Sequence, residues 1–137
     1  SGKGYSRKKL MFLGTFLELI ILIIIIYVPN QPILFLAVFM ILFGFFTGFF
    51  FVSFASMQLI NKQEASGTSI GFINMFNALC GALCDPLIGH FLDLGWDHKY
   101  AMDDVRVFSV YDYRVALLTL PIGLIIALVS LYFFKEK

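Results

Sequence analysis

The sequence predicts an all-α membrane protein with four transmembrane helices, and three observations lead to this fold class. Hydrophobic residues make up 60% of the chain and charged residues only 14%. The mean hydropathy of +0.89 is far above that of soluble domains. The apolar residues fall into four long blocks, about residues 10–28, 33–57, 66–93 and 114–134, and each can cross a hydrocarbon core roughly 30 Å thick.

The first block, residues 10–28, has a single charge, Glu18, almost at its centre. An isolated carboxylate at that depth is costly, so Glu18 is expected to be protonated, paired or in contact with an aqueous cavity. It is a candidate proton-coupling residue, and its alternative role is a structural hydrogen bond to a neighbouring helix. The chain opens at Ser1 without a methionine, so we expect it to be a piece of a longer protein.

The second block, residues 33–57, follows a short turn with two prolines and is rich in phenylalanine. Gly44 and Gly48 have the small-xxx-small spacing of membrane helix contacts and predict a packing seam. Thr47, Ser53 and Ser56 could line a pathway, or their hydroxyls could bond back to their own helix.

The third block, residues 66–93, combines an apolar surface with a small and polar stripe. On a helix, Asn74, Gly81 and Asp85 fall within about 40° of one another. Lipid would make these polar groups costly, so we expect the stripe to face protein or water. Gly81 is a candidate packing residue and Asp85 a second candidate proton-coupling residue.

A longer polar segment, residues 94–113, precedes the fourth block, residues 114–134. Its aromatic residues suit a membrane interface. His98 lies near Asp97 and Asp103, but the spacing matches no metal motif, so we predict a solvated loop and no metal site. Pro121 is expected to kink the last helix.

The distribution of basic residues predicts the orientation. Seven lie on one face of the four-span topology (Lys3, Arg7, Lys8, Lys9, Lys62, Lys135 and Lys137), and three lie on the other (Lys99, Arg106 and Arg114). The positive-inside rule therefore places both termini in the cytoplasm. Basic residues do not alternate with aromatic residues as in a nucleic-acid groove, so no nucleic-acid partner is expected.

Several stretches resemble the major facilitator superfamily of transporters, most closely its bacterial metabolite–proton symporters and phagosomal nutrient transporters. Glu64 to Asn74, Gly81-Ala82-Leu83, Pro86 to Gly89 and Asp93 are similar to the eleventh helix of that family. Tyr113 to Leu117 with Leu120-Pro121-Ile122 resembles the start of the twelfth helix, and Ser6 to Leu10 the end of the basic loop before the ninth. Asp85 departs from the pattern, since many relatives have an uncharged residue there.

The resemblance implies that residues 1–137 are the C-terminal part, helices nine to twelve, of a twelve-helix transporter in the bacterial inner membrane. The second and third blocks would then line the central cavity, and the first and fourth would be peripheral supports. Asn74 and Asn77 become candidate substrate-binding residues for a small polar solute, which protons would accompany. The partners implied are the lipid bilayer and the missing N-terminal helices, with no cofactor.

Two other functions stay open. A small four-helix multidrug exporter would use one carboxylate in its first span, where Glu18 lies, although the long polar segment and the charge asymmetry are not typical of that class. A four-span assembly or scaffold subunit would use the glycine seams equally well. An enzyme is not expected, because the sequence offers no defensible set of catalytic residues on facing positions.

Overall fold

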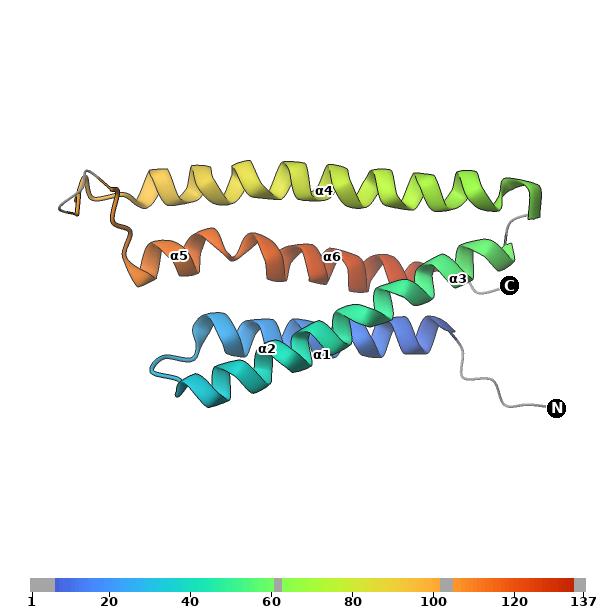
Figure 1. The fold of residues 1–137 in the computed structure, drawn as a ribbon, viewed down its shortest axis with the longest axis horizontal. Helices are drawn as coiled ribbons and strands as arrows, with labels where there is room; N and C mark the ends of the chain where they lie inside the picture. Colours follow the sequence, from blue (N-terminus) through green and yellow to red (C-terminus); the bar gives the residue numbers. More distant parts are fainter. Residues whose placement is uncertain (1–6, 61–62, 102–104, 135–137) are drawn as a thin grey trace.

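A computed structural model describes residues 7–60, 63–101 and 105–134 of the chain (Figure 1). The helices are α1 (Arg7–Tyr27), α2 (Ile33–Thr47), the 3₁₀ turn η1 (Gly48–Phe50), α3 (Phe51–Ile60), the 3₁₀ turn η2 (Gln63–Ala65), α4 (Ser66–Gly95), α5 (Val110–Ala116) and α6 (Thr119–Phe133). Together these elements make 4 helical spans that are long and apolar enough to cross a membrane. The first span is α1, the second comprises α2, η1 and α3, the third is α4, and the fourth comprises α5 and α6. The prediction of an all-α, four-span membrane protein is confirmed.

The four spans run back and forth in an elongated bundle (Figure 1). The start of α1, the end of α3, the start of α4 and the end of α6 lie at one end of the bundle, and the α1–α2 and α4–α5 connections lie at the other. This alternation places both ends of the described chain on the same side, as the four-span topology requires. The basic residues Lys3, Lys62, Lys135 and Lys137 of the charge count lie outside the described residues.

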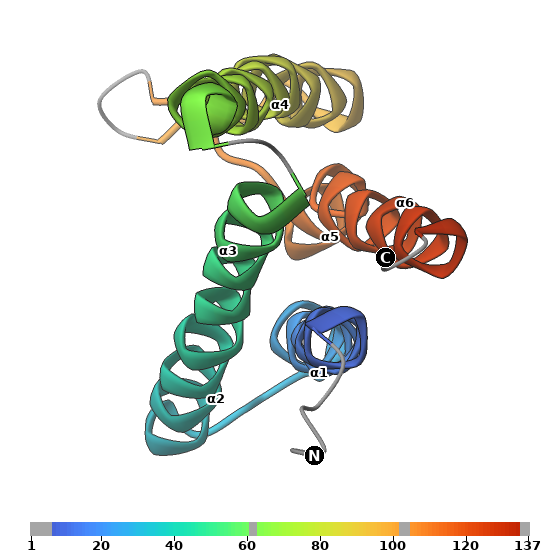
Figure 2. The ribbon, with the colours of Figure 1, turned by 90° about the vertical axis from the view of Figure 1, so that its right-hand side faces the viewer.

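Helix α1 is the centre of the packing. It contacts α2, η1 and α3 on one side and α6 on the other (Figure 2). Its buried residues are Gly14, Leu19, Ile21 and Leu22, whereas α4 has no buried residue. The resemblance to the transporter family implies that this first span is a peripheral support; within this chain it packs on the second and fourth spans, whereas α4 packs on α3, α5 and α6.

Gly14 of α1 lies directly against the side chain of Phe49 in η1. A Cβ atom added there would lie 2.7 Å from the Cβ of Phe49 in η1. By contrast, a Cβ added at Gly44, Gly48 or Gly81 would meet no neighbouring atom within 4 Å. The glycines predicted to pack therefore have no helix against them in the described part of this chain, and their packing role stays a prediction about other partners. The small-xxx-small pattern did not identify Gly14 as a packing residue, because no small residue lies four positions before or after it.

Three hydrogen bonds fasten α1 to the fourth span. At the terminal end, the Lys8 ammonium donates to the carbonyl oxygens of Tyr132 (2.8 Å) and Phe134. The last carbonyls of a helix lack intrahelical donors, and a lysine commonly supplies one. At the opposite end, the Tyr27 hydroxyl donates to the Arg114 carbonyl at 2.9 Å. Lys8 thus has a structural role besides the positive-inside role expected for the basic cluster.

The fourth span begins at Val110, four residues before the predicted start of the block at Arg114. A capping box explains the difference: the Asp112 backbone N–H donates to Ser109 Oγ at 3.2 Å, and the Ser109 N–H donates to Asp112 Oδ2 at 2.7 Å. These bonds satisfy two donors at the helix start. As expected, the span is interrupted near Pro121, between α5 and α6.

The connection between α4 and α5 is ordered by side-chain contacts at its base. Arg106 forms a salt bridge of 2.7 Å with Asp93, and its guanidinium carbon lies 4.6 Å from the centre of the Trp96 ring. The His98 ring lies 4.8 Å from the Trp96 ring at a tilt, and Asp103, the second carboxylate considered for a metal, lies outside the described residues. The base of the predicted loop therefore contains a cluster of side-chain contacts around Trp96 and Arg106.

We expect Gly14→Ala to destabilise the chain by about 1–3 kcal/mol, because the new methyl group forces α1 and η1 apart. Gly44→Ala is the matched control, since its methyl group enters open space and alanine favours the helix. The measurement is unfolding by a denaturing detergent, followed by circular dichroism. Equal stability of the two variants would show that α1 and η1 are not in close contact.

Candidate functional site

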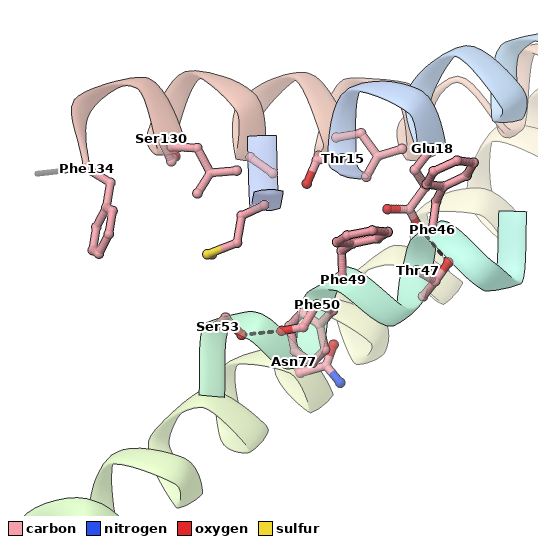
Figure 3. Close-up of a pocket in the computed structure, with 14 residues that line it drawn as sticks. Thr15, Glu18, Phe46, Thr47, Phe49, Phe50, Ser53, Asn77, Ser130 and Phe134 are labelled. Carbon is pink, nitrogen blue, oxygen red and sulfur yellow. Dashed lines mark hydrogen bonds between the residues drawn. The ribbon is translucent and has the colours of Figure 1, made fainter. Parts of the chain in front are cut away.

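A cavity of about 590 Å³ lies between α1, the bent second span and α6, with one residue of α4 in its wall (Figure 3). Its volume is in the range of small-molecule binding sites. The lining residues are Met11, Thr15, Glu18, Phe46, Thr47, Phe49, Phe50, Ser53, Asn77, Leu124, Ala127, Ser130, Leu131 and Phe134.

Each of the three spans around the cavity supplies one face. From α1 come Met11, Thr15 and Glu18, whose spacing of four and three residues places them on the same side of a helix. The bent second span supplies residues on both sides of the 3₁₀ turn η1, and this turn lies in the cavity wall. A 3₁₀ segment inside a longer helix changes the register of its side chains, so residues 46–50 and Ser53 can point into one space.

Glu18 and Thr47 form the polar centre of the cavity. The Thr47 hydroxyl lies 2.8 Å from Glu18 Oε1 and 2.9 Å from the carbonyl oxygen of Phe43, one turn earlier on α2. The hydroxyl has one proton and can donate to only one of these acceptors at a time. Glu18 thus lines the cavity and is hydrogen-bonded to a neighbouring span, and its role as a proton-coupling or a structural residue stays a prediction.

This geometry accommodates both protonation states of Glu18. When the carboxylate is charged, Thr47 donates to it. When the carboxyl is protonated, it can donate to the Thr47 oxygen while Thr47 donates to the Phe43 carbonyl. The contact between Glu18 and Thr47 is therefore kept in both states, with Thr47 as the donor in one and the acceptor in the other.

Asn77 is the candidate substrate-binding residue that the structure places in the cavity. It lies on α4 and also lines a second cavity of about 420 Å³, together with Phe50, Phe72, Ile73, Phe76 and Cys80. Asn77 and Phe50 thus stand where the two cavities adjoin. In Figure 3 the Asn77 side chain lies close to Phe50, at the side of the cavity opposite α1.

Asn74 and Asp85 are exposed and line neither of these cavities. On a helix, Asn77 projects about 60° away from Asn74, and α4 turns the face with Ile73 and Ile88 toward the other spans. Asn74 and Asp85 lie at the margin of that face. The structure therefore brings Glu18 and Asn77 to one cavity and leaves the other two candidates on an uncovered strip of α4.

The hydroxyl groups considered as pathway residues have different positions. Ser53 lines the cavity while donating to the Phe50 carbonyl at 2.6 Å. Ser56 is buried and donates to the Val52 carbonyl at 2.9 Å, so its hydroxyl serves its own helix. Sequence reasoning did not identify Thr15 and Ser130, two hydroxyls in otherwise apolar helices that line the cavity from α1 and α6.

Within residues 7–60, 63–101 and 105–134, no three His, Cys, Asp or Glu side chains gather closely enough to hold a metal ion. Comparison with known proteins gave no assignment: no protein-family model matches the chain, and no curated protein or solved structure shows significant similarity to it.

We expect Thr47→Val to lower stability by about 0.6–2 kcal/mol, the range of interhelical hydrogen bonds in membranes, because Glu18 loses its donor. Thr47→Ser retains the hydroxyl and should stay near the native value. Detergent-induced unfolding of the two variants provides the comparison. Native stability of Thr47→Val together with a loss in Thr47→Ser would mean that the threonine methyl group, and not the hydrogen bond, stabilises this contact.

Proposed function

We propose that this chain belongs to a secondary active transporter that moves a small polar solute across the bacterial inner membrane, coupled to protons. The observation that carries the proposal is the cavity among the spans, where Glu18, Thr47 and Asn77 line one space. Polar side chains around a cavity at membrane depth mark solute and proton pathways in membrane proteins.

The resemblance to the major facilitator superfamily supports the larger architecture that we propose. Residues 64–93 would be the eleventh helix of a twelve-helix parent, and the missing helices would supply the other half of the site. The uncovered strip of α4 with Asn74 and Asp85 agrees with this proposal, because lipid is a poor environment for a carboxylate and an amide. The exposed apolar residues of α2, such as Ile33 and Ile41, suit contact with lipid chains.

Two carboxylates are candidates for proton coupling. Glu18 lines the cavity and keeps its hydrogen bond in both protonation states through Thr47 and the Phe43 carbonyl. Asp85 is exposed and lines neither cavity in the described part of the chain. These observations favour Glu18, although the resemblance alone would place it on a peripheral helix.

The second candidate function is a small four-helix exporter, and the position of Glu18 is the observation that favours it. A carboxylate in the first span that lines a cavity among four helices is what such an exporter requires. The two functions differ in whether the chain acts alone. Under the major facilitator proposal, liposomes containing only this chain should show no solute flux, whereas an exporter should be active as this chain or its oligomer.

The transport proposal predicts that Asn77→Ala in the full-length parent lowers solute uptake at least about tenfold while surface abundance stays near the native level, because one lost membrane hydrogen bond rarely unfolds a helical bundle. Leu79→Ala is the matched control on the same helix, since Leu79 is not among the residues lining the two cavities. Native uptake by well-expressed Asn77→Ala protein would contradict a solute contact at this residue.

For proton coupling, we expect Glu18→Gln to abolish the pH dependence of uptake and Asp85→Asn to leave it unchanged. Glutamine preserves the hydrogen bond with Thr47 but cannot exchange a proton. The measurement is solute-driven proton movement in vesicles. The opposite pattern would assign coupling to Asp85, and no effect of either variant would exclude both carboxylates.

The orientation is also testable. In a background without Cys80 and Cys84, an impermeant thiol reagent added to intact cells should label Asp97→Cys and spare Glu64→Cys, since the charge distribution places the α4–α5 connection outside. The reverse labelling would place both termini outside the cytoplasm.

A further inference from the structure

The cavity has one charged residue and aromatic walls. Glu18 is the charged side chain among its described lining residues, which include no lysine, arginine or histidine. Thr47 donates to Glu18 Oε1, and among the described residues no donor contacts Oε2. An ionised carboxylate in an apolar cavity is favourable only when a positive charge compensates it, and coulombic attraction is strong where water is scarce.

Three phenylalanines of the second span, Phe46, Phe49 and Phe50, line the same cavity as this carboxylate. Phe46 and Phe49 are stacked with ring centres 6.0 Å apart, and Phe50 follows on the same turn. Figure 3 shows the Phe46 and Phe49 rings beside Glu18. The face of an aromatic ring is negative and attracts cations, and aromatic walls around a carboxylate are suited to ammonium groups.

Three hydroxyl groups of the lining, those of Thr47, Ser53 and Ser130, add to the same preference, because each already donates its proton within the protein. Ser53 donates to the Phe50 carbonyl at 2.6 Å, and Ser130 donates to the Ile126 carbonyl at 2.8 Å. Thr47 donates to Glu18 or to the Phe43 carbonyl. These three oxygen atoms are left to act as acceptors beside the Glu18 carboxylate, while the Thr15 hydroxyl and the Asn77 amide can also donate to polar groups of a solute.

We propose that the solute of this cavity is a monovalent organic cation, with its ammonium group against Glu18 and its carbon atoms on Phe46, Phe49 and Phe50. The proposal rests on the proposed function only in taking this cavity as the solute site, and it does not depend on the coupling ion. Anionic solutes are disfavoured, because they would face Glu18 without a basic partner among the described lining residues.

Choline and its uncharged isostere 3,3-dimethylbutan-1-ol test the requirement for charge, since the two differ in one atom, nitrogen for carbon. Equilibrium dialysis with the full-length parent in lipid nanodiscs measures their binding. We expect choline to bind at least about tenfold more tightly than the alcohol, through its charge on Glu18 and the aromatic rings. This comparison uses the native protein and does not depend on the folding of any variant.

Variants then locate the site. Glu18→Gln should weaken choline binding about 30-fold or more, the effect of removing one partner of a desolvated charge pair. Phe49→Leu should weaken it about 2- to 30-fold through the lost ring face. Phe45→Leu is the matched control, because Phe45 is 65% exposed and is not a lining residue, and it should bind choline as the native chain does.

Equal binding of choline and the alcohol, native binding by folded Glu18→Gln, or no choline binding by the native chain would each overturn the proposal of a cationic solute. None of these results decides the transport proposal, which depends on solute uptake by the Asn77→Ala parent. Conversely, choline binding that Glu18→Gln abolishes would support a cation site even if the parent proved not to be coupled to protons.

Discussion

The close contact between α1 and the second span positions Glu18 and Thr47, the polar pair of the cavity. At Gly14 the two segments approach so closely that a Cβ atom would lie 2.7 Å from Phe49. One turn further along α1, Glu18 reaches Thr47 at 2.8 Å. Lys8 and Tyr27 then hold α1 against the fourth span near both of its ends, so the cavity is enclosed on a second side. A rotation of α1 would separate Glu18 from its hydrogen-bond partner and from the aromatic rings.

Hydropathy predicted the four spans because a bilayer imposes length and composition on each helix separately. It also identified Glu18 as exceptional, since a mid-span carboxylate is costly regardless of the fold. The partner of Glu18 was not predictable in the same way. Helical periodicity orders residues around one axis but does not specify which faces of two helices meet, so Thr47 was considered only as one of three hydroxyls. The early start of the fourth span was readable from Ser109 and Asp112, whose spacing is that of a capping box.

The third span shows where the sequence pattern and the structure diverge. The stripe of Asn74, Gly81 and Asp85 is a property of one helix, but the surface that α4 turns toward this chain is centred nearer Asn77. A stripe predicts that some polar or protein surface lies opposite and does not say which one. The same limit applies to the glycines. Gly44 and Gly48 have the small-xxx-small spacing, but no atom of another helix lies close to them, whereas Gly14 packs against Phe49 without being part of such a spacing. With no similar family, protein or structure found, Glu18, Thr47 and Asn77 support a transport role through their geometry, and the resemblance supports the larger architecture as a proposal.

The most direct test is whether water-soluble molecules enter this space from the membrane surface. In a background without Cys80 and Cys84, single cysteines replace Thr15, Ser53 and Ser130, which line the cavity, and Ile126, which is 61% exposed on the outer surface of α6. Reaction rates with a small, charged methanethiosulfonate reagent are then measured in lipid nanodiscs. A solute-accessible cavity predicts fast labelling at the three lining positions and slow labelling at Ile126, which lipid would cover. Slow labelling at all four positions, or equal rates at all four, would contradict a polar cavity centred on Glu18 and Thr47.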